Sequence, residues 1–306
     1  MSSVSTAGSA VRLRLDLAYD GTDFSGWAAQ PGRRTVEGEL SEALGTLLRV
    51  PEPPRLTVAG RTDSGVHARG QVAHCDVDPA ALEAVVGRSR RSPEDALLVR
   101  LAGVLPHDVV VHRVCRAAAG FDARFSASFR RYSYRIADAL GQRDPLRRRD
   151  TVWIADRLDE AAMTEASAAL VGLHDFAAFC KKRAGASTVR TLMHFTWSRE
   201  PDGVLGGDIA ADAFCHNMVR ALVGALVPVG QGRRPVDWPV EVLRSRLRNS
   251  RVRVMPARGL CLEQVSYPRQ GQLAAQAELA RAPRRLPGDE PEAPFVRSEG
   301  DRATPE

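Results

Sequence analysis

The chain has 306 residues, of which 44% are hydrophobic, so it can bury the core of one large domain or of two ordinary ones. Its formal net charge is +6, and because residues 269–306 carry six Arg against seven Asp and Glu, residues 1–268 hold about +7. This composition argues against general disorder, and the positive excess favours a polyanionic partner such as nucleic acid over a merely basic surface.

The cysteine pattern and the N-terminus indicate a cellular compartment. The five cysteines lie far apart and form no Cys-x-x-Cys pair, so neither a disulfide framework nor a zinc knuckle is predicted. The first ten residues lack the basic region of a signal peptide, and no apolar stretch approaches membrane-spanning length. We therefore expect a protein of the reducing cytoplasm, without a membrane partner.

The first third of the chain predicts six elements. Residues 11–19 alternate between apolar and mostly charged side chains, which is typical of a half-buried strand. Thr35 is a suitable N-cap for a helix, and Pro93 can occupy the first turn of another. In chain order, the expected elements are a strand at 11–19, a helix after Thr35, strands at 56–58 and 71–77, a helix from Pro93 and a strand at 109–111. The order is β-α-β-β-α-β.

The same order recurs in the second part of the chain. The expected elements are a strand at 129–136, a helix after Asp156, strands at 192–198 and 204–211, a helix from Val219 to Leu226, an extra helix from Pro239 and a strand at 260–266. Without the extra helix, this part again reads β-α-β-β-α-β.

Two such units predict an α+β protein in which two ferredoxin-like halves join mostly antiparallel sheets around a central cleft. We place the N-terminal half at 11–115 and the C-terminal half at 116–268. Residues 1–10 and the Pro-, Ala- and Glu-containing tail at 269–306 are expected to be unstructured. A fold of this kind does not by itself define a function.

A glycine-containing loop at residues 60–70 joins the second and third predicted strands. Its glycines permit backbone angles that would hold Arg61 and Asp63 at a tip. An Asp-Ser-Gly segment between strands is also common as a plain turn. A further alternative is a metal site built from Asp63, His67, His74 and Asp76. Their spacing matches no tight ligand pattern.

Several segments resemble the TruA-type tRNA pseudouridine synthases. The most specific is Ala-Gly-Arg-Thr-Asp-Ser-Gly-Val-His-Ala at residues 59–68, which is close to the catalytic signature of that family. Further matching segments, in family order, are Tyr19-Asp20-Gly21 with Gly26-Trp27, then residues 123–127, 130–134, 214–220 and 259–262. The resemblance runs from residue 11 to about residue 267. It departs from the family near Trp27, where Ala28 and Phe24 replace residues that are often Gln and Tyr.

The resemblance implies that the chain converts uridine to pseudouridine in the tRNA anticodon stem-loop, at positions 38 to 40, without a cofactor or metal. Asp63 would be the essential carboxylate that initiates cleavage of the N-glycosidic bond, after which the uracil rotates and reattaches through C5. A carboxylate could attack C1′ or remove a sugar proton. Both routes stay open.

Other site residues follow from the same resemblance. Arg220 is expected to pair with Asp63 and keep it ionised, the alternative being an ordinary helix-surface Arg. Tyr132 is expected to stack on the target base, the alternative being core packing. Leu260 and Leu262 would wall the pocket, unless they are plain core residues.

RNA contacts are also implied. Arg61 is expected to displace the target nucleotide from the stem, with phosphate contact as its alternative. Basic clusters containing Arg148, Lys181 and Lys182 would contact tRNA phosphates or form solvated loops. The histidines, including His216, are expected to be structural. The family also implies a homodimer whose subunits share one tRNA.

Two other functions compete with an RNA isomerase. A non-catalytic RNA-binding module would require an aromatic platform on a central strand, and only Tyr132 and Tyr134 could contribute to one. A metal-dependent hydrolase would need a metal and would lose activity with a chelator.

Overall fold

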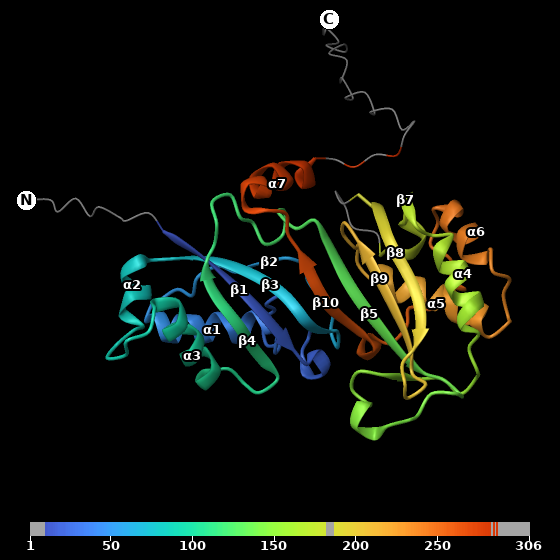
Figure 1. Cartoon of the computed structure of the whole chain (residues 1–306), viewed down its shortest axis with the longest axis horizontal. Coiled ribbons are helices and arrows are strands. Elements are labelled where there is room, and N and C mark those ends of the chain that lie inside the picture. Colours follow the sequence, from blue (N-terminus) through green and yellow to red (C-terminus); the bar gives the residue numbers. More distant parts are fainter. Residues whose placement is uncertain (1–9, 182–186, 283, 285, 287–306) are drawn as a thin grey trace, which may run out of the picture.

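The structure, a computed structural model, describes residues 10–181, 187–282, 284 and 286. One sheet runs through this part of the chain in the strand order β4-β1-β3-β10-β5-β9-β8-β7, with β2 paired to β3 and β6 to β5 (Figure 1). The strands are β1 Val11–Tyr19, β2 Thr57–Val58, β3 His67–Val77, β4 Val109–Arg116, β5 Phe129–Ala137, β6 Val152–Trp153, β7 Gly172–Asp175, β8 Val189–Arg199, β9 Leu205–Ala211 and β10 Leu260–Ser266. Only the pairs β3–β10 and β5–β6 are parallel among these strands. The predicted α+β class with a mostly antiparallel sheet is confirmed.

Helices pack beside both parts of the sheet. They are α1 Val36–Leu48, α2 Pro79–Ala84, α3 Pro93–Val104, α4 Glu160–Ala168, α5 Met218–Gly230, α6 Trp238–Ser245 and α7 Leu273–Arg281. Figure 1 shows α1 to α3 beside the strands of the first third, and α4 to α6 beside β7 to β9. The predicted helices are therefore present, and α2 and α7 are additional.

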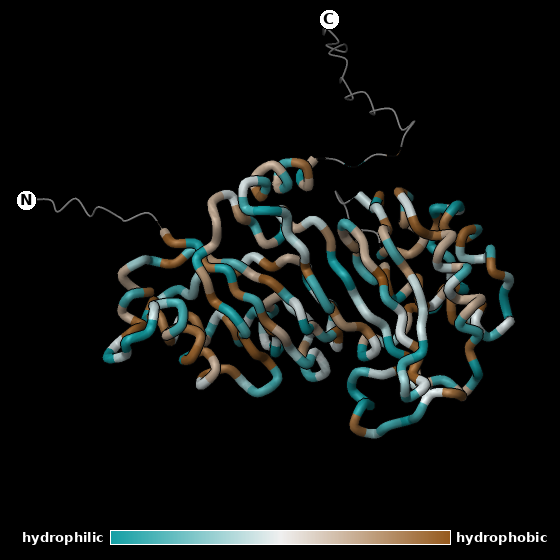
Figure 2. The backbone as a smooth tube through the Cα atoms, in the orientation of Figure 1, coloured by the Kyte–Doolittle hydropathy of each residue, from teal (hydrophilic) through white to brown (hydrophobic). Residues whose placement is uncertain are grey.

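Local sequence explains where these elements form. The apolar positions of β1 point into the core, where Leu13, Leu15 and Leu17 are at most 1% exposed. Figure 2 shows hydrophobic and hydrophilic residues alternating along several strands. Helix α1 begins after Thr35, whose side-chain oxygen accepts a hydrogen bond from the Gly38 amide at 3.2 Å.

Strand β10 joins the two parts of the sheet. It pairs in parallel with the start of β3, where Cys261 lies opposite His67. On its other side it pairs antiparallel with β5, where Leu262 lies opposite Tyr132. Strand β10 belongs to the second part of the chain. It thereby lies next to the loop between β2 and β3, which belongs to the first part.

Some predicted boundaries are wrong. Strand β3 begins at His67 instead of residue 71, because β10 pairs with its first residues and lies so close that a Cβ at Gly70 would clash with the Glu263 carbonyl. Helix α4 begins at Glu160, because Asp159, not Asp156, caps it through a hydrogen bond from the Ala162 amide. Strand β7 was not predicted.

The prediction of an unstructured tail from residue 269 is wrong for residues 270–281. Helix α7 lies in this segment, and its Leu273 and Ala277 are 4% and 3% exposed. Gly120, with a φ of +75°, lets α7 pack closely, since a Cβ there would lie 2.9 Å from the Ala274 Cβ. Residues 283, 285 and 287–306 of the tail lie outside the described residues, as do residues 1–9.

Candidate active site

Asp63 lies in a tight turn between β2 and β3. The Val66 amide donates to the Asp63 carbonyl at 3.1 Å, and Gly65 has a φ of +77°. A second glycine, Gly26, allows the neighbouring segment to approach, because a Cβ there would lie 2.8 Å from the Thr62 carbonyl oxygen. The Trp27 amide donates to that same oxygen at 3.0 Å.

Buried side chains support this turn from below. The hydroxyls of Thr62 and Tyr19 are hydrogen-bonded at 2.7 Å. Gln71, fully buried in β3, donates to the Tyr19 hydroxyl at 3.1 Å and to the Gly60 carbonyl at 2.9 Å. The segment that leads into the turn is thus tied to β1 and β3, which restricts the position of Asp63.

Two side chains from the start of α5 reach the Asp63 carboxylate. His216 Nε2 lies 3.2 Å from Oδ1, and Arg220 Nη1 lies 3.7 Å from Oδ2. Arg220 is oriented by its own Nε, which donates to the Met255 carbonyl at 2.6 Å. Asn217, at the N-cap, has a φ of +66°, a conformation that Asn adopts more readily than most residues.

A cleft of about 1410 Å³ opens over Asp63. Arg61, Tyr132, Arg220 and Leu260 also line it, so the structure brings five predicted site residues to one cavity. Tyr132 is 7% exposed and packs edge-on against Phe214, with the ring centroids 5.1 Å apart. Burial raises the pKa of Tyr132, with smaller contributions that include the Asp63 charge, so its hydroxyl is neutral at ordinary pH.

Comparison with known proteins identifies the family to which the chain is similar. The family model for tRNA pseudouridine synthase matches residues 166–268. A tRNA pseudouridine synthase A of Streptomyces griseus is 56% identical over 279 residues, which cover 91% of this chain and 95% of the relative. The proteins of the same name from Leifsonia xyli and Cutibacterium acnes are 54% and 50% identical, over 90% and 89% of this chain and 99% and 95% of their own lengths.

The chain belongs to the tRNA pseudouridine synthase A family. Members of this family are isomerases that convert uridine to pseudouridine. The family resemblance of the sequence is therefore confirmed.

Some of the predicted site residues lie outside the cleft that contains Asp63. Leu262 is fully buried behind the cleft, which fits the alternative of a core residue. Arg148 is exposed outside the cleft and donates to the Pro145 carbonyl of its own loop at 3.1 Å. Lys181 is exposed and its backbone amide donates to the His216 carbonyl, whereas Lys182 lies outside the described residues.

His216 is more than a structural histidine, because it contacts the Asp63 carboxylate. His216 precedes α5, which begins at Met218, so helical spacing alone does not predict its contact with Asp63. His67 and His74 both lie in β3, where each accepts a backbone hydrogen bond. His67 accepts a hydrogen bond from the Gly21 amide at 3.1 Å, and His74 accepts one from the Ala123 amide at 3.0 Å.

A disulfide joins Cys180 to Cys215, whose Cα atoms are 5.8 Å apart. The sequence predicted no disulfide framework, and this pair was therefore not expected. The two residues are 35 positions apart, and only the packing of α5 against residues 177–179 brings them together.

Within residues 10–181, 187–282, 284 and 286, no group of three or more His, Cys, Asp or Glu could hold a metal ion. The alternative that uses Asp63, His67, His74 and Asp76 therefore finds no support there, and Asp76 instead pairs with Arg12 at 2.7 Å. No helix of the described part of the chain is long and apolar enough to span a membrane.

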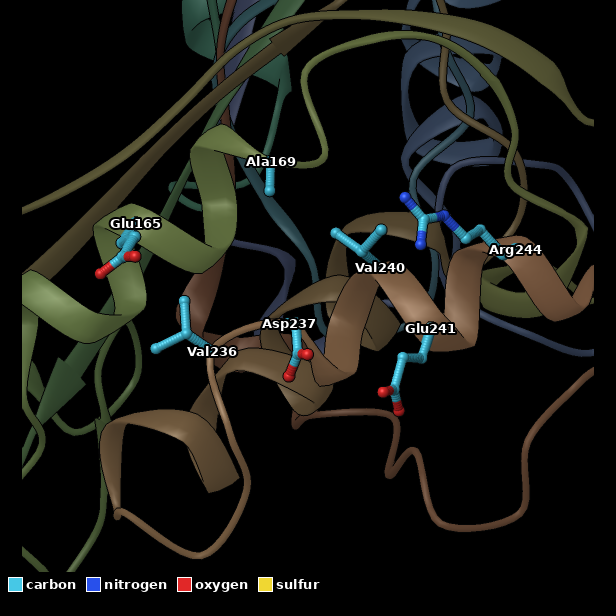
Figure 3. A pocket seen from close by; sticks show the side chains of 7 residues that line it. All are labelled: Glu165, Ala169, Val236, Asp237, Val240, Glu241 and Arg244. Carbon is cyan, nitrogen blue, oxygen red and sulfur yellow. The ribbon is translucent and has the colours of Figure 1, made fainter.

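A smaller hollow of about 430 Å³ lies between α4 and α6 (Figure 3). Its lining residues are Glu165, Ala169, Val236, Asp237, Val240, Glu241 and Arg244. None of them belongs to a segment that resembles the family signature, and none lines the cleft of Asp63.

Proposed function

We propose that the chain isomerises uridine to pseudouridine at positions 38 to 40 of the tRNA anticodon stem-loop, with Asp63 as its essential carboxylate and without a cofactor. The observation that carries this proposal is the position of Asp63. It lies in a large cleft, tied to a rigid turn, with Arg220 and His216 beside its carboxylate.

The chemistry needs one carboxylate and no redox step. The bond between C1′ and N1 of the uridine breaks, the uracil rotates, a bond from C1′ to C5 forms, the C5 proton leaves and N1 takes up a proton, so that the product is an isomer of uridine. Asp63 would begin the reaction by attacking C1′ or by removing a sugar proton, and both routes use the ionised carboxylate. A cation next to a carboxylate favours this charged form, which is the role that we assign to Arg220.

Other cleft residues have positioning roles in the proposal. Tyr132 would stack on the target base, and Leu260, on the adjacent strand β10, would add an apolar wall beside it. Arg61 is exposed at the cleft, as a side chain that displaces a base from the stem must be.

Replacing one oxygen of Asp63 tests the assignment. Asp63→Asn keeps the shape of the side chain but removes its charge, so pseudouridine formation should disappear while tRNA binding stays nearly intact. Asp76→Asn is the matched control, because Asp76 lies in β3 outside the cleft and pairs with Arg12. Substantial turnover by Asp63→Asn, or equal loss in the control, would contradict the role of Asp63.

The domain organisation and the oligomeric state can also be inferred. We infer two ferredoxin-like halves at 11–115 and 116–268, because the strand orders β4-β1-β3-β2 and β10-β5-β9-β8 both follow the pattern of such a unit. We also infer a cytoplasmic homodimer that shares one tRNA. Light scattering that reports only monomer at micromolar concentration would contradict the dimer.

A further inference from the structure

A group of arginines from β5, β8 and the segment after α7 lies on the wall of the same cleft, next to Tyr132. It consists of Arg130, Arg190 and Arg284, with Asp212 as the neighbouring carboxylate, and we name it the Arg190 cluster. Arg130 and Tyr132 are two residues apart on β5, so their side chains share one face of the sheet. The cluster therefore borders the place where the target base is expected.

Positive charge in this cluster exceeds negative charge. Arg284 Nη1 pairs with Asp212 Oδ2 at 2.9 Å, while Asp212 Oδ1 already accepts the backbone amides of Thr191 and Ala213. Three guanidinium groups thus face one carboxylate whose oxygens are both engaged. Removing charges from water without compensation is costly, so such an excess is expected where an anion binds.

The three arginines differ in how well their donors are satisfied. Arg130 is 8% exposed and donates to the carbonyls of Asp212, Ala59 and Arg124, which accounts for both terminal nitrogens. Among the residues that the structure describes, Arg190 donates only from Nη1, to the carbonyl of the adjacent Val189. Its Nε is buried and has no hydrogen-bond partner among the described residues. Arg130 is therefore structural, and Arg190 has donor capacity left for a ligand.

The electrostatic surroundings of Arg190 agree with this geometry. Burial lowers the pKa of Arg190, and the nearby charges of Arg284 and Arg130 lower it further. An incoming anion would relieve this repulsion, whereas a neutral ligand would not. A guanidinium is also well suited to a phosphate, because its planar donors match two oxygens at once.

We propose that Arg190, assisted by Arg284, binds one phosphodiester of the RNA strand close to the target uridine. This subsite rests on the proposed function for its ligand, since RNA is the polyanion expected in the cleft. Arg190 would be a binding residue that fixes the position of the strand, separate from Asp63 and its chemistry. Arg284, which follows α7, links the C-terminal segment to substrate binding.

The test compares Arg190→Gln with Arg131→Gln, two variants that lose the same charge. Arg131 lies one residue from Arg130 but outside the cleft, where it pairs with Asp208 at 3.0 Å. Arg190→Gln should raise the tRNA Kd about five- to tenfold and reduce the slope of log Kd against log salt by about 0.9, the loss of one phosphate contact. Its melting temperature should stay equal or rise, because an uncompensated charge has left a buried site. Arg131→Gln should leave the slope unchanged.

A purely structural Arg190 gives the reverse result, with a lower melting temperature and an unchanged Kd and salt slope, and this would overturn the proposal. A second measurement includes wild type, so it can overturn the proposal even if Arg190→Gln folds poorly. Binding of wild type and of Arg190→Gln is measured on a series of stem-loop RNAs, each of which carries one uncharged methylphosphonate linkage at a different position. One linkage near the target uridine should weaken binding to wild type but not to Arg190→Gln, and the absence of any such linkage would overturn the subsite.

These outcomes are separate from those of the proposed function. If wild type binds the RNA with the expected phosphate pattern but forms no pseudouridine, the isomerase proposal fails and the anion subsite stands. If wild type forms pseudouridine but no linkage depends on Arg190, the subsite fails alone.

Discussion

The Asp63 carboxylate contacts one turn at the start of α5, where His216 and Arg220 take one oxygen each. The two partners are not equivalent. The Arg220 side chain is 19% exposed and is held by the Met255 carbonyl, whereas the His216 side chain is 46% exposed. An exposed partner is screened by water, so its electrostatic contribution is the smaller one.

This difference predicts the relative effects of two substitutions. Arg220→Gln should lower single-turnover pseudouridine formation by about a hundredfold, and His216→Gln by less than about tenfold. Both variants should bind tRNA, which a filter-binding assay at the same salt concentration checks. A larger loss in His216→Gln than in Arg220→Gln would show that the imidazole, not the guanidinium, is the main partner of Asp63.

A substitution of Arg61 can distinguish two roles for this residue, the displacement of a base and contact with a phosphate. Lys keeps the charge but lacks a planar group that can stack among bases. Arg61→Lys should therefore retain the tRNA Kd and its salt slope while losing about tenfold or more in turnover. Arg148→Lys, outside the cleft, is the control and should behave nearly as wild type. An RNA with the target uridine mismatched should rescue Arg61→Lys more than wild type, and equal losses in binding and turnover without rescue would contradict base displacement.

The lowered pKa of His74 should make the free energy of unfolding depend on pH. Burial lowers its pKa from the ordinary value of 6.5, Arg12 lowers it further, and Asp122 and Asp76 only partly oppose this. The unfolded chain therefore binds the proton more readily, so the stabilisation is complete above about pH 6.5 and is lost as the pH falls from there through the lowered pKa of the folded state. Protonation would also break the hydrogen bond from the Ala123 amide.

Urea unfolding at pH 7.5 and 5.5 measures this effect. The drop in unfolding free energy between the two pH values should be smaller in His74→Gln than in wild type. His112→Gln, at an exposed position of β4, is the matched control and should keep the drop of wild type. An unchanged drop in His74→Gln would show that His74 does not carry the acid sensitivity.

At the level of elements, the regular periodic segments were predictable and the contacts between distant segments were not. The strands at β1, β5 and β10 follow from alternation, and α1 and α3 follow from their caps and apolar spacing. Helix α7 was missed because its buried face consists of little more than Leu273 and Ala277, and its packing partner near Gly120 is far away in sequence. The same reason hid the Cys180–Cys215 pair.

Helix α7 also contributes to the cleft. Arg281 lies over the Phe125 ring at 4.8 Å, and both residues line the cleft together with Arg284. Figure 1 shows α7 beyond the end of β10, away from the other helices.

Removing the tail tests whether this docking matters. Deletion of residues 269–306 exposes the surface that Leu273 covers, and should lower the melting temperature by about 4 °C or more and raise the KM for tRNA. Deletion of residues 287–306 removes none of these contacts and is the control. Equal melting temperatures and equal KM values in the two deletions would show that α7 contributes neither stability nor substrate binding.

The whole molecule explains why the site residues meet. Asp63 precedes β3, Tyr132 lies on β5, Arg220 on α5 and Leu260 at the start of β10, and the β3–β10 pairing joins these parts. The sequence allowed Asp63, Arg61, Arg220 and Tyr132 to be placed in one site only through their resemblance to a family. The contributions of His216 and Arg190 required the folded chain, because each depends on a neighbour that no local pattern identifies.

The most direct measurement of the central claim is a map of pseudouridine in a tRNA transcript after incubation with the purified protein. The transcript carries uridine at positions 38 to 40 and at other sites, and chelator is present in one arm. Carbodiimide reactivity or mass spectrometry should locate pseudouridine only at positions 38 to 40, equally with and without chelator, and not with Asp63→Asn. Pseudouridine elsewhere, or none with wild type, would contradict the assignment, and a loss with chelator that a divalent ion restores, with tRNA folding controlled, would contradict metal-free chemistry.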